Sequence, residues 1–174
     1  MIGFETIGNA TITIFDDKPV LTTDPWISGK PYFGSWTHAY DIPKNQMNNI
    51  INSKYVWFSH GHPDHLDPDS LEYFKDKTIL ISDHYGNRIF NELKKKYKCI
   101  KLENNIWFEI SKNVRIKSFA DWNQDSCLLI EINKKDIILN LNDGSALGWS
   151  REIKKIIKNY KNKFLLKLIN LSLI

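Results

Sequence analysis

The stretch "FSHGHPDHLD", residues 58–67, gathers three of the chain's five histidines and two aspartates. An apolar run, "KYVWFS" at 54–59, precedes it and has the character of a short buried β-strand. The residues that follow, "PDSLEYF" at 68–74, predict a helix, because Asp67 is a good N-cap and Pro68 suits the first helical position. The sequence therefore predicts that this polar stretch is a loop between a strand and a helix.

The spacing of the histidines in this loop suits metal binding. His60 and His62 are two residues apart, so an extended chain places both imidazoles on the same side. Asp64 and His65 follow on the turn and reach toward a second position, and Pro63 stiffens the loop between the two pairs. Divalent transition metals favour imidazole and carboxylate ligands, and an open coordination position activates bound water near neutral pH. We interpret the loop as a metal site rather than as an ordinary polar turn.

The rest of the chain predicts one α/β domain over 1–174. With 174 residues, 42% of them hydrophobic, the chain is long enough for one packed core and short for two. We expect an N-terminal hairpin over 10–24 and an ordered, aromatic-rich loop over 24–46. The strands expected after the motif are 78–82, 98–102, 105–110, 113–120, 126–132 and 136–143, and the helices are 86–97 and 150–160.

Charge and composition limit the partners. The net charge of +4 is concentrated after residue 150, where seven basic residues accompany Glu152 alone. A basic end without interleaved aromatic residues is typical of a solvated helix, so we expect no nucleic-acid partner. The chain shows no signal segment and no apolar run long enough for a bilayer, and Cys99 and Cys127 match no paired spacing. We expect a cytoplasmic protein that acts on a small-molecule substrate, with no membrane partner and with both cysteines in structural roles.

The loop also has the His-x-His-x-Asp-His pattern of the metallo-β-lactamase superfamily, as His60-Gly61-His62-Pro63-Asp64-His65. "TTDPWISG" at 22–29 resembles the Asp-Pro-Trp segment of members akin to CMP-N-acetylneuraminate hydroxylase. "FADWNQDSCLLIEINKKDIILNLNDG" at 119–144 resembles the segment of the same group that ends in the metal-bridging aspartate. The resemblance implies an αββα sandwich with the metals at one edge.

The resemblance also implies a set of ligands. His60 and His62 match the first metal site, Asp64 and His65 match the second, and Asp143 matches the carboxylate that bridges both. A further first-site histidine is usual before the penultimate strand, but "ADWNQDS" at 120–126 contains none. We expect Asp121 to take its place, with Asp125 as the alternative, and a carboxylate there favours manganese or iron over zinc.

The two remaining histidines do not complete the set. His84 follows a predicted strand, and we expect it to be a surface or loop residue. For His38, in the aromatic loop near Trp36, contact with substrate is the less favoured of two readings. Since no histidine follows His84, the last ligand of the second site is missing, and the resemblance implies that this site is the weaker one.

The C-terminal end departs from the superfamily's pattern. The expected sandwich contains the first half of the usual fold and only the start of the second, and 162–174 is an atypical apolar tail. An unfinished sheet leaves a strand edge and apolar surface uncovered. We therefore expect self-association through the C-terminal region.

Three functions are consistent with these observations. The first is a metal-dependent hydrolase in which an activated water attacks an ester, lactone, amide or phosphodiester, with Asp64 as both ligand and proton acceptor. The second is a non-haem iron oxygenase-related domain of nucleotide-sugar metabolism, and the third is an inactive, truncated remnant. The expected cofactor is one or two divalent ions, zinc before iron or manganese.

Overall fold

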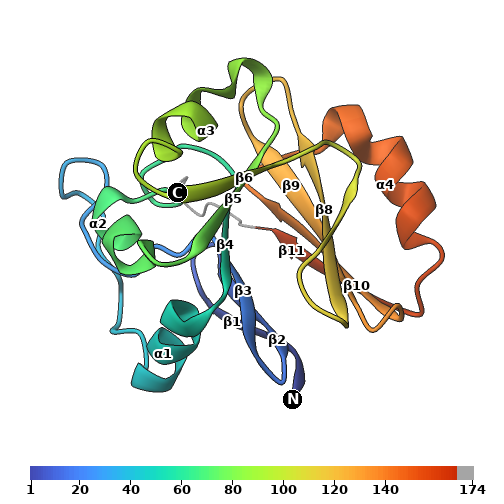
Figure 1. Ribbon diagram of the computed structural model, residues 1–174, viewed down its shortest axis with the longest axis horizontal. Coiled ribbons are helices and arrows are strands. Elements are labelled where there is room, and N and C mark those ends of the chain that lie inside the picture. The colour runs from blue at the N-terminus through green and yellow to red at the C-terminus, as the bar shows by residue number, and fades with distance from the viewer. Residues whose placement is uncertain (168–174) are drawn as a thin grey trace, which may run out of the picture.

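Two β-sheets pack face to face in the computed structural model, which describes residues 1–167 apart from the side chain of Leu147 (Figure 1). The first sheet contains β1 (Ile2–Gly8), β2 (Thr11–Asp16), β3 (Lys18–Thr23), β4 (Tyr55–Phe58), β5 (Thr78–Ser82) and β6 (Lys98–Leu102), in that order. The second contains β11 (Asn162–Lys167), β10 (Asp136–Asn142), β9 (Ser126–Ile132), β8 (Val114–Ala120) and β7 (Trp107–Glu109). These are the two central layers of the sandwich that the superfamily resemblance implies.

Strand direction brings the chemically interesting loops to one edge. β3, β4, β5 and β6 run parallel, so the loops that follow them leave from the same end of the first sheet. In the second sheet β8, β9 and β10 alternate in direction, so β8 and β10 end on one side and β9 begins there. The segments after β3, β4, β8 and β10 therefore meet at one edge of the sandwich.

Helices cover the outer faces of both sheets. The helices are α1 (Lys44–Asn52), α2 (Pro68–Leu71), α3 (Arg88–Leu93) and α4 (Ser150–Ile157). The first three lie on the outer face of the first sheet and α4 lies on that of the second, which completes an αββα arrangement (Figure 1). None of the helices in residues 1–167 is both long and apolar enough to cross a membrane.

Alternating side chains separate the layers. Along β4, Trp57 packs between the sheets, whereas Val56 and Phe58 pack under the helices. Along β9, Leu128 packs between the sheets and Leu129 packs toward α4. All five side chains are buried, because each strand of the core has apolar cover on both of its faces.

The predicted elements are largely confirmed, with differences that have local causes. The N-terminal hairpin becomes a three-stranded unit, because Ile2–Gly8 also pairs with β2 although its sequence lacks clear alternation. The helix predicted over 86–97 is shorter, since Gly86 (φ 73°) and Asn87 (φ 53°) are left-handed and the regular helix begins only at Arg88. α1 was not predicted because only Ile50 in it is buried.

The first part of the atypical tail is an edge strand. Asn162–Lys167 pairs parallel with β10 and extends the second sheet. Phe164 and Leu165 remain exposed on this strand. Residues 168–174 of the predicted tail lie outside the described residues, and self-association through this region stays a prediction.

Candidate metal centre

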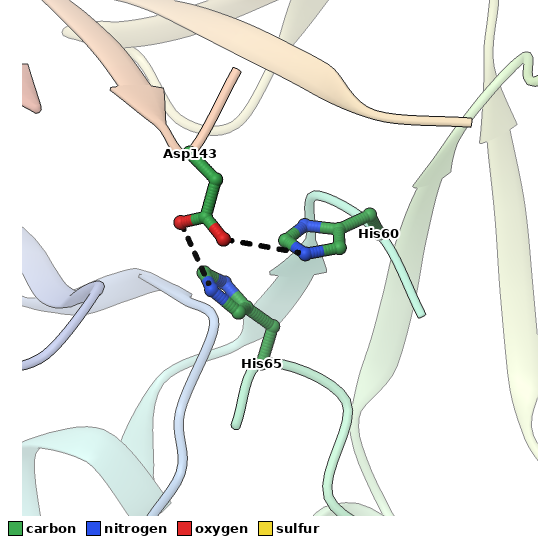
Figure 2. Close-up of side chains that lie close together, drawn as sticks. All are labelled: His60, His65 and Asp143. Atoms are coloured by element: carbon green, nitrogen blue, oxygen red, sulfur yellow. Dashed lines mark ion pairs between the residues drawn. The ribbon is translucent and has the colours of Figure 1, made fainter. Parts of the chain in front are cut away.

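Five of the predicted ligands come together at the edge where the strands end. The loop after β4 carries His60, His62, Asp64 and His65, and Asp143 follows β10 on the opposite sheet. One ligand atom from each of His60, His65 and Asp143 lies within 4.8 Å of the others (Figure 2). Residues 60 and 143 therefore meet across the two sheets, as the superfamily resemblance implied.

Asp143 divides its two carboxylate oxygens between the histidines. Oδ2 lies 3.7 Å from His60 Nε2, whereas Oδ1 lies 3.3 Å from His65 Nε2 (Figure 2). Oδ2 also lies 4.0 Å from His62 Nδ1. The close contact with His65 and the neighbouring imidazoles hold the pKa of Asp143 below its usual range. The Asp143 carboxylate therefore lies between His60 and His65, with one oxygen toward each.

His60 and His62 form the outer half of the centre. His60 Nε2 lies 2.7 Å from His62 Nδ1. The side chain of His62 is 63% exposed, while His60 is buried. Burial, reinforced by the positive charge of His65, lowers the pKa of His60 to about 4. His60 is therefore neutral at pH 7, which is the form that binds metals.

His65 forms the inner half and is surrounded by carboxylates. Its Nδ1 lies 3.5 Å from Asp24 Oδ2, and its Nε2 lies 3.5 Å from Asp64 Oδ2 in addition to the Asp143 contact. Burial alone would lower the pKa of His65, but the charges of Asp24 and Asp143 outweigh it and raise this pKa to about 10. The pocket around His65 therefore demands a positive charge, which a proton on the imidazole or a metal cation satisfies.

Unpartnered atoms support the cation as the better occupant. His65 Nε2 and Asp143 Oδ1 are buried and have no hydrogen bond of acceptable geometry, although they lie 3.3 Å apart. Buried polar atoms without partners are costly and rare in folded proteins. Imidazole and carboxylate donors are also those that zinc, iron and manganese prefer. The residues present therefore fit a divalent transition metal.

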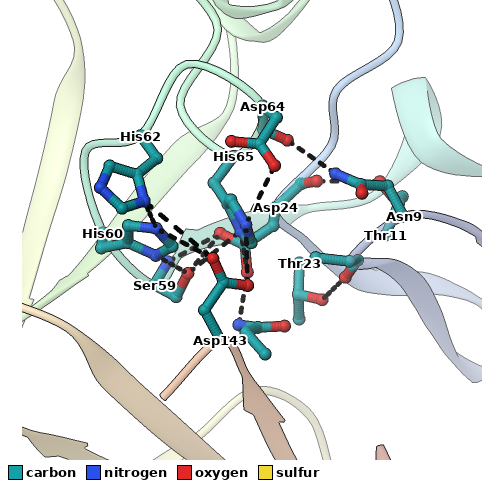
Figure 3. A network of polar contacts seen from close by, with 12 residues as sticks. Asn9, Thr11, Thr23, Asp24, Ser59, His60, His62, Asp64, His65 and Asp143 are labelled. Carbon is teal, nitrogen blue, oxygen red and sulfur yellow. Dashed lines mark hydrogen bonds and ion pairs between the residues drawn. The ribbon is translucent and has the colours of Figure 1, made fainter. Parts of the chain in front are cut away.

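Asp24 is a site residue that the sequence reasoning missed. It follows β3 and is fully buried, and its Oδ1 accepts hydrogen bonds from Ser59 N (2.8 Å) and Ser59 Oγ (3.0 Å). Its Oδ2 accepts from Asn142 Nδ2 (2.6 Å), so the ends of β3, β4 and β10 are tied together behind His65 (Figure 3). A carboxylate behind a metal-ligating histidine fixes the orientation of the ring. Its place directly after a predicted strand, within "TTDPW", was the available signal.

The two aspartates offered for the missing first-site ligand lie in different places. Asp125 Oδ1 is 3.5 Å from His60 Nδ1, the ring nitrogen that does not face Asp143. Burial raises the pKa of Asp125 to about 6, and the charges of Asp143 and Asp24 add to this effect. Asp121 lines a separate pocket with His84 and makes no ion pair or side-chain hydrogen bond to the motif within the described residues. The structure brings Asp125 to the motif, and ligation by Asp121 stays a prediction.

The two remaining histidines have structural contacts. His84 lies in a loop, but the expectation of a surface position is wrong, since only 2% of the residue is exposed. Its Nε2 is 3.0 Å from the carbonyl oxygen of Ser59, and burial lowers its pKa. His84 is buried because the loop after β5, which carries it, packs against Ser59 at the start of the motif. His38 stacks on Trp26 at 4.2 Å between ring centroids, with Nε2 3.0 Å from the Trp26 carbonyl.

A cavity of about 450 Å³ opens beside His60 and His62. Leu66, Ile89 and Leu93 form an apolar wall, and Gln124 and Asp125 are among the polar residues opposite. This volume is within the range of small-molecule sites. A small substrate therefore has room next to the outer half of the metal centre.

No family model matches the chain, but individual proteins do. It is 28% identical over 132 residues to cytidine monophosphate-N-acetylneuraminic acid hydroxylase from Danio rerio, which covers 69% of this chain and 22% of that protein. A possible metal-dependent hydrolase from Veillonella parvula has a TM-score of 0.70 at 12% identity, over 95% of this chain and 70% of that one. CmlA, a diiron β-hydroxylase from Streptomyces venezuelae, has a TM-score of 0.65 at 11% identity, over 89% and 32%.

These similarities agree with the architecture. The chain has the metallo-β-lactamase fold, and its sequence is similar to the CMP-N-acetylneuraminate hydroxylase group. The match spans about a fifth of the length of the curated hydroxylase. Similarity at 11 to 12% identity to solved structures shows the fold alone.

Proposed function

We propose that this protein is a metal-dependent hydrolase whose centre holds one or two divalent cations between the His60 to His65 loop and Asp143. The observation that carries the proposal is the division of the Asp143 oxygens between His60 and His65, together with the unpartnered Asp143 Oδ1. A bound divalent cation would supply an activated water near neutral pH and polarise the bond under attack. The fold neighbour named as a possible metal-dependent hydrolase supports this class.

The residues around the proposed centre have different roles. His60 and His62 would hold a cation in the outer half, beside the cavity, and Asp64 with His65 would hold one in the inner half. Asp24 and Asp125 would orient His65 and His60 from behind, through the ring nitrogens that face away from Asp143. Of the carboxylates, Asp64 is also the one we assign to proton uptake, as expected from the sequence.

An iron-dependent oxygenation chemistry is the second candidate. Two observations favour it: the sequence similarity to a hydroxylase and the fold similarity to a diiron β-hydroxylase. Carboxylate-rich donor sets suit iron and manganese better than zinc. Asp24, Asp64, Asp125 and Asp143 make the surroundings of this centre rich in carboxylates.

Metal analysis and a hydrolytic assay together test the proposal. The chain, purified without chelators, is analysed for zinc, iron and manganese, then assayed on chromogenic esters and phosphodiesters before and after chelation. We expect at least one divalent ion per chain and a hydrolytic activity that chelation removes and metal restores. Iron with no hydrolysis of any substrate would favour the oxygenase class, and a folded chain that takes up no metal would contradict both.

Asp64→Asn separates chemistry from folding. We expect this substitution to abolish hydrolysis while it shifts the melting temperature of the metal-free chain by little, because the amide keeps the size of the side chain. Asp67→Asn is the matched control, since Asp67 caps α2 through the Ser70 amide (2.7 Å) and contacts no histidine of the loop. If Asp67→Asn lost activity and Asp64→Asn kept it, the assignment of proton uptake to Asp64 would be wrong.

A further inference from the structure

The aromatic-rich segment between β3 and α1 reaches back to the metal centre through one side chain. Tyr32 Oη donates a hydrogen bond of 2.7 Å to Asp64 Oδ1, across a sequence separation of 32 residues. The segment itself is anchored to the helix after the motif, because Ser70 Oγ accepts from the amides of Ile27 (3.0 Å) and Ser28 (3.1 Å). The hydroxyl of Tyr32 is therefore held at the centre from a separately anchored part of the chain.

This hydrogen bond gives the two oxygens of Asp64 different roles. Oδ1 is occupied by Tyr32, whereas Oδ2 lies 3.5 Å from His65 Nε2, on the side of Asp143. The main chain of Asp64 is fixed as well, because Asn9 Nδ2 donates to its carbonyl oxygen at 3.1 Å (Figure 3). With both main chain and side chain held, rotation of the carboxylate is restricted to one orientation.

We propose that Tyr32 is a positioning residue of the metal centre, which holds Asp64 Oδ1 so that Oδ2 alone is presented to a cation in the inner half. The inference rests on the proposed metal centre. Hydrogen-bonded partners behind a ligand orient it and tune metal affinity. Tyr32 orients Asp64 in this way, as Asp24 orients His65.

The backbone around Tyr32 supports a functional reason for its placement. Tyr32 (φ 55°) and Phe33 (φ 59°) are both left-handed, a conformation that bulky residues rarely adopt. Such strain costs on the order of 1–3 kcal/mol per residue and persists where the surroundings enforce it. The turn does not bury Phe33, whose side chain is fully exposed, and the long-range contact it secures is that of Tyr32 with Asp64. Ser35 closes the turn by donating to the Tyr32 carbonyl from its amide (3.2 Å) and its hydroxyl (2.5 Å).

Tyr32→Phe tests this inference, with Tyr40→Phe as the matched control. Tyr40 belongs to the same segment, and within residues 1–167 the one hydrogen bond that its hydroxyl donates goes to the carbonyl oxygen of Ile7, at 3.4 Å. Affinity for zinc or manganese chloride is measured by competition with a chromogenic chelator, alongside the melting temperature of each metal-free chain. We expect Tyr32→Phe to weaken one bound ion by about 10-fold or more. Tyr40→Phe should match the wild type in metal affinity.

A double substitution separates positioning from a general effect on stability. If Tyr32 acts through Asp64, the affinity losses of Tyr32→Phe and Asp64→Asn are not additive, and the double variant binds as weakly as Asp64→Asn alone. Additive losses, or wild-type affinity in Tyr32→Phe, would overturn the inference while leaving the metal centre intact. A wild-type chain that takes up no metal would instead remove the proposed function on which the inference rests.

Discussion

The inner and outer halves of the proposed metal centre are supported in different ways. His65 is fully buried, has Asp24 behind one ring nitrogen, and faces Asp64 and Asp143 with the other. The side chain of His62, by contrast, is 63% exposed, and the polar contacts of its imidazole within the described residues are His60 at 2.7 Å and Asp143 at 4.0 Å. Preorganised ligands lose less conformational freedom when they bind. The inner half is therefore the one we expect to bind first.

This order is the reverse of the one that the histidine count implies. Counting ligands alone, the missing last histidine makes the second site the weaker one. The structure also shows which groups contact the inner ligands from behind: Asp24 contacts His65, and Tyr32 contacts Asp64. In the outer half, Asp125 and Ser59 contact His60 in the same way, but His62 has no such partner within the described residues. Which half is the stronger is therefore a measurable disagreement between ligand number and preorganisation.

The largest effect is expected for the residue that both halves share. Asp143→Ala removes oxygen from each half, and we expect the chain to lose at least about 100-fold in metal affinity, because losing an outer partner already costs 10–100-fold. Chelator competition measures this loss. The control is Asp136→Ala, at the opposite end of β10, where the carboxylate bonds Asn162 instead. Equal affinities in the two variants would contradict a shared Asp143.

Removing one histidine from each half compares the halves directly. In the metal-free chain, His65→Ala leaves Asp24 without its buried cation, so the free energy of unfolding should fall by about 3 kcal/mol. His62→Ala removes an exposed side chain and should change it by less than about 0.5 kcal/mol. Urea unfolding of both variants measures the difference. Comparable destabilisation by the two substitutions would show that the halves are equally preorganised.

Asp125→Asn and Asp121→Asn sharpen the description of the outer half. Asp125 lies behind His60, so its loss should weaken the outer-half ion by about 10-fold, whereas Asp121→Asn should leave affinity unchanged. Isothermal titration with manganese or zinc measures both variants. The reverse result would restore Asp121 as the missing ligand that the sequence favours.

The smallest effect is the pH dependence of the metal-free chain. The folded state keeps a proton on His65 up to about pH 10, whereas the unfolded imidazole loses it near 6.5. The folded state therefore binds more protons in that window, and the free energy of unfolding should fall as pH rises. Urea unfolding between about pH 6.5 and 7.5 stays below the pKa of about 8.5 at which unfolded thiols ionise. Saturation with metal should remove this slope, because the cation replaces the proton, and a stability that rises with pH in the metal-free chain would contradict the account.

The sequence predicted most of the strands and the ligand loop well because both depend on local patterns, and the superfamily resemblance supplied the αββα sandwich. The apolar run 54–59 indicated the buried strand β4, on which Trp57 and Val56 lie on opposite faces, and the strand-to-helix position of the loop fixed where His60 and His65 emerge. The superfamily resemblance supplied Asp143, which lies on the other sheet. Asp24, Tyr32 and the burial of His84 depend on contacts across 25 or more residues, which no local pattern encodes.

Anomalous diffraction from crystals soaked in zinc or manganese tests the central claim most directly, because it locates the ion itself. The account predicts a metal peak between the Asp143 carboxylate and His65, within bonding distance of Asp64 Oδ2, and a second, weaker peak toward His60 and His62. If Asp143 and His65 are well ordered at saturating metal and no peak lies between them, the account is wrong.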